Sequence, residues 1–417
     1  MKLHINQERL EQRIQQLATF TEKNKPYTRR SFSKLFLESR EWLKQEFIKA
    51  GLETRIDAGG NLIGLRAGTD NNLKPIGSGS HSDTVPEGGR FDGIAGVLAA
   101  LEVAHSLKDN NVQLKHDFEV IDFLAEEPSD YGLSRVGSRA LSGDLTAQML
   151  EYTAPDGSTL AEGISRVGGD PSALNSPLLR TGDVAGFFEL HIEQGPVLET
   201  EQLDIGIVTD IVGITRYDMR FTGRPDHSGT TPMDIRADAL VGAAKVIDRI
   251  NIEAKSWLDK KPYVVATVGK LDVTPNGSNV VPGVVDFMLE VRSNDDNIAK
   301  QLPLDIEKFA HRVAADLGLV FDSTFVSFSP AAKCHSHIQD SIETVCRTNS
   351  VSHRSMPSGA GHDTACMTKL GPAGMIFIPC LGGRSHCPEE WSSADQLGLG
   401  THIMYQAIID FDKKQSI

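Results

Sequence analysis

The stretch of chain from residue 76 to residue 127 decides the fold. It opens with IGSGSHSDTV (76–85) and closes with FEVIDFLAEE (118–127). Residues 76–80 and 118–124 have the composition of short buried strands, and apolar residues at helical spacing predict a helix over 93–107. A strand, a helix and a second strand in this order predict a parallel α/β sheet.

The pattern on either side of this stretch predicts two domains. Helical spacing runs from Gln7 to about Ala50 and stops at Gly51, and short strands are expected at 61–66 and 186–192. Strict alternation at 214–221, 263–271 and 284–292, with helices at 232–250 and 295–317, is typical of an antiparallel sheet covered on one face. A buried strand returns at 373–379, and a helix follows from about 394.

We therefore expect an α/β fold with a discontinuous catalytic domain, residues 1–211 and 327–417, built on a mainly parallel central sheet flanked by helices. An inserted α+β domain, residues 212–326, is expected to carry the antiparallel sheet. Residues 129–184 contain few clear signals.

Composition excludes several classes of protein. The 417 residues include 42 Lys and Arg against 56 Asp and Glu, a net charge of −14, and no clustered basic stretch, so we expect no nucleic-acid partner. The charged N-terminal residues do not resemble a signal peptide and no run of about 18 apolar residues occurs, which predicts no membrane partner and a cytoplasmic location. The five cysteines lack CxxC spacing and are expected to be free thiols.

Polar side chains gather where the predicted strands end. His81 follows the first strand and Asp92 begins the helix after it, while Glu126 and Glu127 end the strand at 118–124. Imidazole next to carboxylate is a pattern that binds divalent metals, and a metal would offset the repulsion within the acidic pair. One of the two carboxylates then remains free as a general base.

Two more histidines, His191 and His386, follow predicted strands in the same way. Taken singly, a histidine at a strand end is more often structural, and an acidic pair is usually a solvated loop. Several nitrogen and oxygen ligands at the ends of strands in one sheet are better explained by a shared metal site, for which Zn²⁺ or Mn²⁺ suits the ligand types.

These residues resemble the M20 metallopeptidase-like amidohydrolases, in the branch of N-carbamoyl-L-amino acid hydrolases, allantoate amidohydrolases and β-ureidopropionases. The segments that carry the resemblance span nearly the whole chain: 79–85 (GSHSDTV), 89–96 (GRFDGIAG), 126–128 (EEP), 137–140 (GSRA), 190–196 (LHIEQGP), 226–233 (DHSGTTPM), 275–283 (PNGSNVVPG), 358–363 (SGAGHD) and 385–389 (SHCPE).

The resemblance implies two divalent metal ions per subunit, Zn²⁺ or Mn²⁺, with Co²⁺ and Ni²⁺ also compatible. Asp92 would bridge the metals, with His81 and His191 on one and Glu127 and His386 on the other. Glu126 would be the general base, and Asp83 would orient the imidazole of His81.

The resemblance also implies substrate-binding residues and a homodimer formed by the inserted domain. His227 would help polarise the substrate carbonyl; its alternative is a histidine in a surface turn. Arg292, with Asn279 and Gln194, would hold the substrate carboxylate; the alternative for Arg292 is a solvated side chain or a local ion pair. The resemblance further assigns Ser358, Gly359 and Ala360 to substrate binding.

The substrate implied is a small ureido or amide carboxylate, foremost an N-carbamoyl-L-amino acid hydrolysed to amino acid, CO₂ and ammonia. Allantoate and the substrate of a β-ureidopropionase are alternatives, followed by an N-acyl-amino acid and by a catalytically silent relative that binds a carboxylate. Arg384 precedes Ser385 and His386 where the family often has an apolar residue, and Cys387 follows where a small polar residue is common. Arg384 would favour a substrate with a second anionic or polar end.

Overall fold

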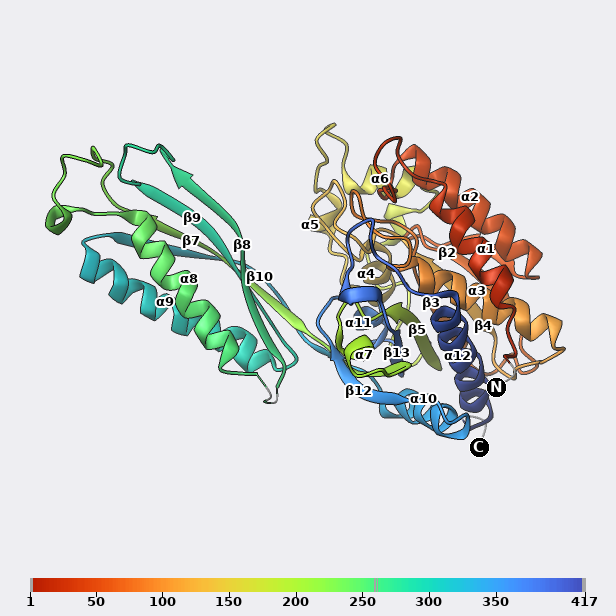
Figure 1. Cartoon of the computed structure of the whole chain (residues 1–417). Coiled ribbons are helices and arrows are strands. Elements are labelled where there is room, and N and C mark those ends of the chain that lie inside the picture. The colour runs from red at the N-terminus through yellow and green to blue at the C-terminus, as the bar shows by residue number, and fades with distance from the viewer. Residues whose placement is uncertain (1–2, 259, 261, 415–417) are drawn as a thin grey trace. The chain divides into compact units, whose positions relative to one another are not determined.

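The computed structural model describes residues 3–258, 260 and 262–414. The chain divides into two compact units (Figure 1). The first contains the residues up to Thr209 and those from Lys333 onward, and the second is Asp210–Ala332. The expected boundaries were 212 and 326, and residue 326 falls inside a strand that belongs to the second unit.

A mixed sheet organises the first unit. Its strand order is β1-β2-β4-β3-β5-β13-β6-β11, with β12 paired to β6. The central strands β4, β3, β5 and β13 are parallel, which confirms the mainly parallel sheet, and antiparallel pairs lie toward both edges. The strands are β1 (Glu53–Ile56), β2 (Leu62–Arg66), β3 (Ile76–His81), β4 (Phe118–Phe123), β5 (Gly186–Ile192), β6 (Ile205–Ile211), β11 (Ala332–Lys333), β12 (His353–Ser358) and β13 (Ala373–Ile378).

Helices bury both faces of this sheet. On one face α3 packs on β3, β4 and β5, and α1 and α12 pack on α3. On the other face α4 packs on β4 and α11 packs on β5 and β13. The helices are α1 (Gln7–Ala18), α2 (Lys34–Lys49), α3 (Ile94–Asp109), α4 (Val136–Ser142), α5 (Ala147–Leu150), α6 (Leu160–Arg166), α7 (Val197–Thr200), α10 (Ser336–Thr348), α11 (Thr364–Met367) and α12 (Ala394–Lys414).

The expected helix from Gln7 to Ala50 is wrong in its middle. Residues between α1 and α2 form turns that include Pro26, which cannot donate a backbone hydrogen bond in a helix. Buried Arg29 ties this segment to the core, because its guanidinium donates to the carbonyls of Leu17, Phe20 and Ser82. The predicted end of the helix at Gly51 is confirmed, because this glycine has a left-handed φ of +87° and α2 ends two residues before it.

Close packing of α3 brings the ends of three strands together. A Cβ on Gly96 would lie 2.3 Å from the Leu190 carbonyl oxygen and 2.6 Å from the Ser80 Cβ, so the helix rests directly on β5 and β3. The N-terminus of α3 therefore lies beside the carboxyl ends of β3, β4 and β5, where ligands bind in open α/β sheets.

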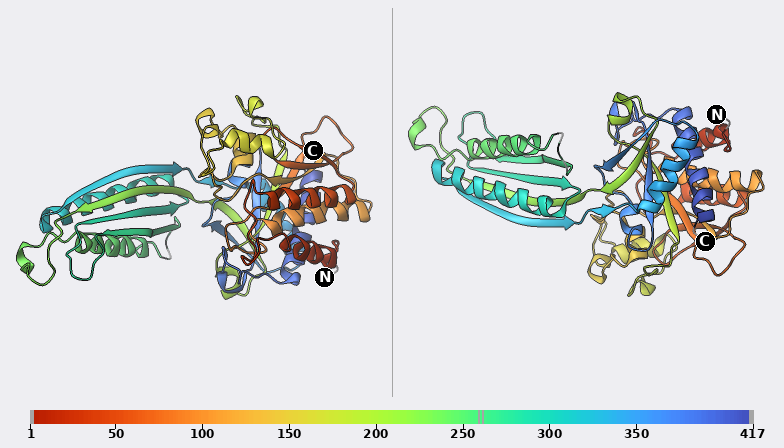
Figure 2. Two further views of the ribbon diagram at one scale, coloured as in Figure 1. Left: turned by 90° about the horizontal axis from the view of Figure 1, so that it is seen from above. Right: turned by 90° about the horizontal axis from the view of Figure 1, so that it is seen from below.

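The second unit is an antiparallel sheet of order β10-β7-β9-β8 that buries an apolar face against α8 and α9. In Figures 1 and 2 both helices run alongside the four strands. On β9 the alternation buries Val285, Phe287, Leu289 and Val291, as predicted. The elements are β7 (Gly213–Thr222), α8 (Ala239–Lys255), β8 (Val264–Thr274), β9 (Val284–Ser293), α9 (Asp296–Leu317) and β10 (Val320–Ser329).

Two expectations for this unit need correction. The helix expected from residue 232 begins at Ala239, because the Asp238 side chain accepts the amide hydrogens of Leu240 and Val241 and so caps it there. Strand β10 was not predicted, because it lies at the sheet edge with Phe321 as its single buried residue and lacks a clear alternation of apolar residues.

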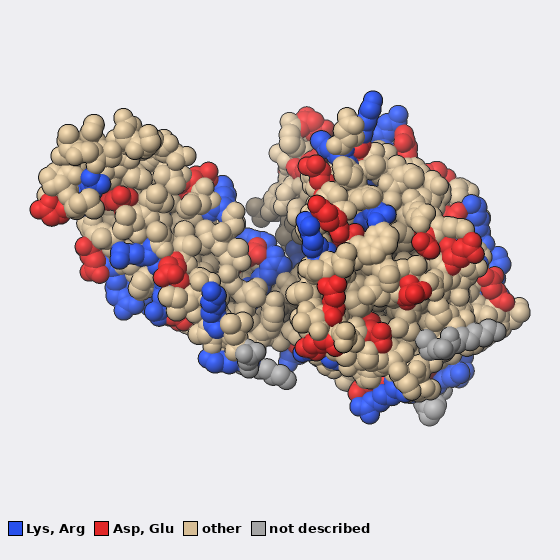
Figure 3. Space-filling model, viewed as in Figure 1, with Lys and Arg blue, Asp and Glu red and all other residues tan. Residues whose placement is uncertain are grey.

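The charges on the surface and the state of the cysteines can be compared with what the composition predicts. The face drawn in Figure 3 carries acidic and basic side chains intermixed. None of the five cysteines is in a disulfide, as expected. In the described part of the chain, every helix is too short or too polar to cross a bilayer.

Candidate active site

The predicted polar residues of the first unit converge at one edge of the sheet. His81 is the last residue of β3, His191 lies near the end of β5, and Glu126 and Glu127 follow β4. Asp92 lies just before α3. The convergence follows from the parallel strands, whose carboxyl ends share an edge.

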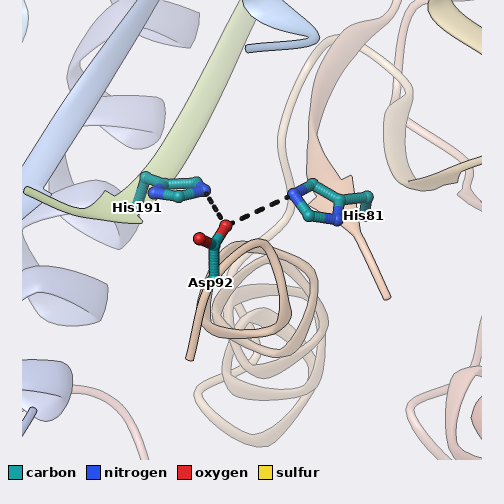
Figure 4. Close-up of side chains that lie close together, drawn as sticks. All are labelled: His81, Asp92 and His191. Atoms are coloured by element: carbon teal, nitrogen blue, oxygen red, sulfur yellow. Dashed lines mark ion pairs between the residues drawn. The ribbon is translucent and has the colours of Figure 1, made fainter. Parts of the chain in front are cut away.

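Two imidazoles face one carboxylate oxygen. The Nε2 atoms of His81 and His191 lie 3.7 Å and 3.3 Å from Oδ1 of Asp92 (Figure 4). The opposite ring nitrogens are engaged, since Nδ1 of His81 donates to the Asp83 carbonyl at 3.1 Å and Nδ1 of His191 to the Ile192 carbonyl at 2.9 Å. Nε2 is therefore the ring nitrogen that each histidine presents to Asp92.

A second cluster shares the same aspartate. Nε2 of His386 lies 3.1 Å from Oδ2 of Asp92 and 3.1 Å from Oε1 of Glu127. His386 comes from an irregular segment with φ of +56° and is half exposed. Asp92 is thus common to two groups of nitrogen and oxygen ligands, one on each of its oxygens.

The electrostatics of both clusters suit cations. Although burial opposes it, hydrogen bonds from His191 and His386 hold the pKa of Asp92 well below its usual range. Hydrogen bonds to Asp92 and Glu127 raise the pKa of His386 to about 11. The site thus attracts positive charge to these atoms, and its imidazole and carboxylate ligands are types that Zn²⁺ and Mn²⁺ accept. These residues fit a pair of divalent ions.

Glu126 lies beside the clusters without joining either ligand group. Its Oε2 is 3.7 Å from Nε2 of His81. Burial, together with the charges of Asp363 and Glu127, raises the pKa of Glu126 well above that of a free glutamate. A carboxylate with a raised pKa is suited to accept a proton near neutral pH.

Asp83 contacts both the His81 ring and the backbone of Glu126 and Glu127. Its carboxylate oxygens accept the amide hydrogens of Glu126 and Glu127, both at 3.3 Å. The contact of Asp83 with His81 is closer through its carbonyl, at 3.1 Å, than through its carboxylate, at 3.5 Å. The expected orienting role is thus shared between backbone and side chain.

The expected substrate-binding residues of the first unit lie in two places. Gln194 contacts the metal-ligand candidates, since its Nε2 donates to Oδ2 of Asp92 at 2.7 Å and its buried Oε1 has no hydrogen-bond partner among the described residues. Ser358 ends β12, and its hydroxyl oxygen accepts the Ala360 amide hydrogen at 3.2 Å and lies 2.8 Å from Nε2 of His362. Gly359 is between them in the same turn.

The second unit does not bring its three candidate residues together. His227 and Asn279 are exposed neighbours, joined by a bridge between His227 and Val280 and by the Ser228 amide donating to the Asn279 carbonyl. Arg292 is near the other end of β9, about 26 Å from Val284 at 3.3 Å per residue. It donates to Glu290 at 2.7 Å. Within one chain, Arg292 and the turn that contains Asn279 therefore lie at opposite ends of β9.

Several polar residues near the site were not predicted. His362 packs edge-on against His191 with ring centroids 4.6 Å apart, and burial lowers its pKa well below 6.5. Ser385 and Glu390 hydrogen-bond around Asp92. The segments 358–363 and 385–389 contained His362 and Ser385, and Glu390 follows directly, but nothing in their spacing distinguished a buried partner from an exposed neighbour.

Comparison with known proteins identifies the family of the chain and several similar enzymes. The model of peptidase family M20/M25/M40 matches residues 77–410, and the chain belongs to this family. Among the similar proteins is an N-carbamoyl-L-amino-acid amidohydrolase of Paenarthrobacter aurescens, 38% identical over 97% of this chain and 98% of the relative. An allantoate amidohydrolase of Bacillus subtilis is 32% identical over 90% of each chain.

A solved structure agrees with this placement. An amidase of the hydantoinase/carbamoylase family from Burkholderia multivorans matches with a TM-score of 0.90 and 33% identity over 98% of each chain. The resemblance seen in the sequence is thereby confirmed, and the chain is an enzyme, an amidohydrolase.

Proposed function

We propose that this amidohydrolase cleaves the ureido group of an N-carbamoyl-L-amino acid, releasing the amino acid, CO₂ and ammonia. The observation that carries the catalytic part is the position of Asp92 between two ligand clusters, with Glu126 beside them. The substrate class is supported by the 38% identity with the Paenarthrobacter aurescens protein.

His81, His191 and Asp92 would hold one divalent ion, and Asp92, Glu127 and His386 the other. Bound there, Zn²⁺ or Mn²⁺ polarises a carbonyl and lowers the pKa of water.

Glu126 then acts as the general base. Its carboxylate takes a proton from the attacking water and passes it to the leaving nitrogen. Asp83 keeps the backbone of Glu126 and Glu127 in place through two hydrogen bonds. The Gln194 amide donates to Asp92, and its buried Oε1 has no hydrogen-bond partner among the described residues.

We propose that the active form is a homodimer in which two chains contribute to each site. The support is that Arg292 lies about 26 Å along β9 from Val284, the end of the strand that adjoins the turn with Asn279 and His227, so one chain is not expected to place all three around one small substrate. Heterodimers of Glu126→Gln and His227→Ala subunits test this. Recovered turnover supports a shared site, and inactive heterodimers contradict it.

The assay for the substrate is ammonia release by metal-stripped and Mn²⁺-reloaded enzyme. The panel contains N-carbamoyl-L-amino acids, allantoate and the matching N-acetyl amino acids. Metal-dependent ammonia from an N-carbamoyl amino acid supports the proposal. Ammonia from allantoate alone selects the allantoate alternative, which the Bacillus subtilis relative favours. Free amino acid from only the acetyl compounds refutes both.

Glu126→Gln provides the control for mechanism. The amide keeps the size of the side chain but cannot accept the proton, so we expect kcat to fall by about 10²- to 10⁴-fold with unchanged metal content. Turnover equal to the wild type would remove Glu126 from the mechanism.

A further inference from the structure

The carboxyl group of Glu390 touches both segments that carry Asp92 and His386. It is buried, with 1% of the residue exposed. Its Oε1 accepts the amide hydrogens of Phe91 and Asp92 at 2.8 Å and 3.0 Å. Its Oε2 is 2.7 Å from the hydroxyl of Ser385, the residue before His386.

Ser385 links the two acidic groups. Its hydroxyl lies 2.7 Å from Oδ2 of Asp92 as well as 2.7 Å from Glu390. Oδ2 is the oxygen that faces His386. Because Asp92 and His386 both lie outside regular helices and strands, neither is held in place by its own secondary structure.

The surrounding residues make room for this contact and reinforce it. A Cβ on Gly89 would fall 1.9 Å from the Glu390 carboxyl carbon, so only glycine leaves space for the carboxylate. The next residue, Trp391, packs edge-on against Phe91 with ring centroids 5.7 Å apart, and the Arg90 guanidinium lies 4.5 Å from a Trp391 ring centroid. The segments 89–92 and 385–391 are thus joined by hydrogen bonds and by stacking.

We propose that Glu390 is a positioning residue that holds Asp92 and His386 at the separation needed to bind metal. The inference rests on the proposed two-metal function. It assigns no contact between Glu390 and substrate or metal; Glu390 acts through the backbone of Asp92 and through Ser385.

The size of the effect follows from what each variant removes. Glu390→Ala deletes the acceptor for two buried amide hydrogens and the partner of Ser385. Loss of such a supporting residue typically weakens metal binding by about 10- to 100-fold. Glu390→Gln keeps an oxygen for the two amides and a polar contact to Ser385, so we expect it to bind metal within about threefold of the wild type.

The experiment is calorimetric titration of metal-stripped protein with Mn²⁺, with thermal unfolding of the same metal-free samples. Glu389→Ala is the matched control, because Glu389 is the adjacent glutamate but is exposed and pairs with Arg384 at 3.1 Å. We expect weakened Mn²⁺ binding in Glu390→Ala, recovery in Glu390→Gln and no change in Glu389→Ala.

Ser385→Ala keeps the conclusion testable if Glu390→Ala does not fold. It removes the hydroxyl that contacts Asp92, Glu390 and Gln194 but keeps the hydrogen bonds from the Phe91 and Asp92 amides to Glu390. We expect weaker Mn²⁺ binding without a matching loss in unfolding temperature. Wild-type affinity in folded Glu390→Ala or in Ser385→Ala overturns the positioning role. Absence of Mn²⁺ binding by the wild type instead overturns the proposed two-metal function.

Discussion

Gly93→Ala tests whether the position of His81 depends on the start of α3. Gly93 has a φ of +69°, and a Cβ placed on it would lie 2.3 Å from Cε1 and Nε2 of the His81 ring. Non-bonded carbon contacts lie at about 3.5–4.0 Å, so the ring must move by about 1 Å or more. Metal–ligand distances tolerate only about 0.2 Å.

We therefore expect Gly93→Ala to lose metal from the cluster of His81, Asp92 and His191 and to lose most of its turnover. The positive φ adds a strain of about 1–3 kcal/mol to the free energy of the folded state. Metal content after equilibration with Mn²⁺ measures the first effect, and chemical denaturation measures the second.

Gly132→Ala separates the two effects. Gly132 has a similar φ of +71°, but apart from Gly132 itself and its two chain neighbours no atom of the described residues lies within 4 Å of the position that a Cβ would occupy there. We expect this variant to show the backbone strain while retaining metal. Full metal content and turnover in Gly93→Ala would refute the reasoning, because the ring would then be free to move without loss of binding.

Three further outcomes are expected. Burial and the neighbouring His4 lower the pKa of His402 to about 4, below the value of about 6.5 in an unfolded chain. The unfolded state therefore binds the proton more tightly, and the free energy of unfolding falls by up to roughly 3 kcal/mol as pH falls from about 6.5 to 4; an equal pH dependence in His402→Gln would contradict this. Arg40→Met leaves the fully buried Asp122 without its 2.8 Å partner, so denaturant titration should show a loss of about 3–5 kcal/mol. Removing metal with a chelator should lower the unfolding temperature of the wild type, and adding Mn²⁺ to a hundredfold excess over Kd should restore about 2.7 kcal/mol, whereas Asp92→Asn should respond to neither.

Some parts of the site were predictable because they depend on local pattern. His81, Asp92, Glu126, Glu127 and His191 each follow or precede an element whose periodicity is clear, and parallel strands end at one edge. The order of strand and helix therefore sufficed to bring them together. His386 was placed by its position after a strand and by the resemblance.

Other parts depend on contacts between residues far apart in the chain. The roles of Glu390 and Ser385 arise from hydrogen bonds across nearly 300 residues of sequence. The turn between α1 and α2 depends on Arg29 reaching carbonyls of two separate segments. Edge strand β10 lacks a buried face of regular period, so its pairing with β7 decides its structure.

The sequence by itself determined the α/β class, the inserted antiparallel sheet and most of the groups at the active edge, because strand and helix periodicities and residue types at strand ends are local properties. Only the tertiary structure decided which oxygen of Asp92 faces each cluster and that Arg292 lies far from Asn279 along the sheet. Those facts depend on strand register and on packing between distant segments, which no local pattern encodes.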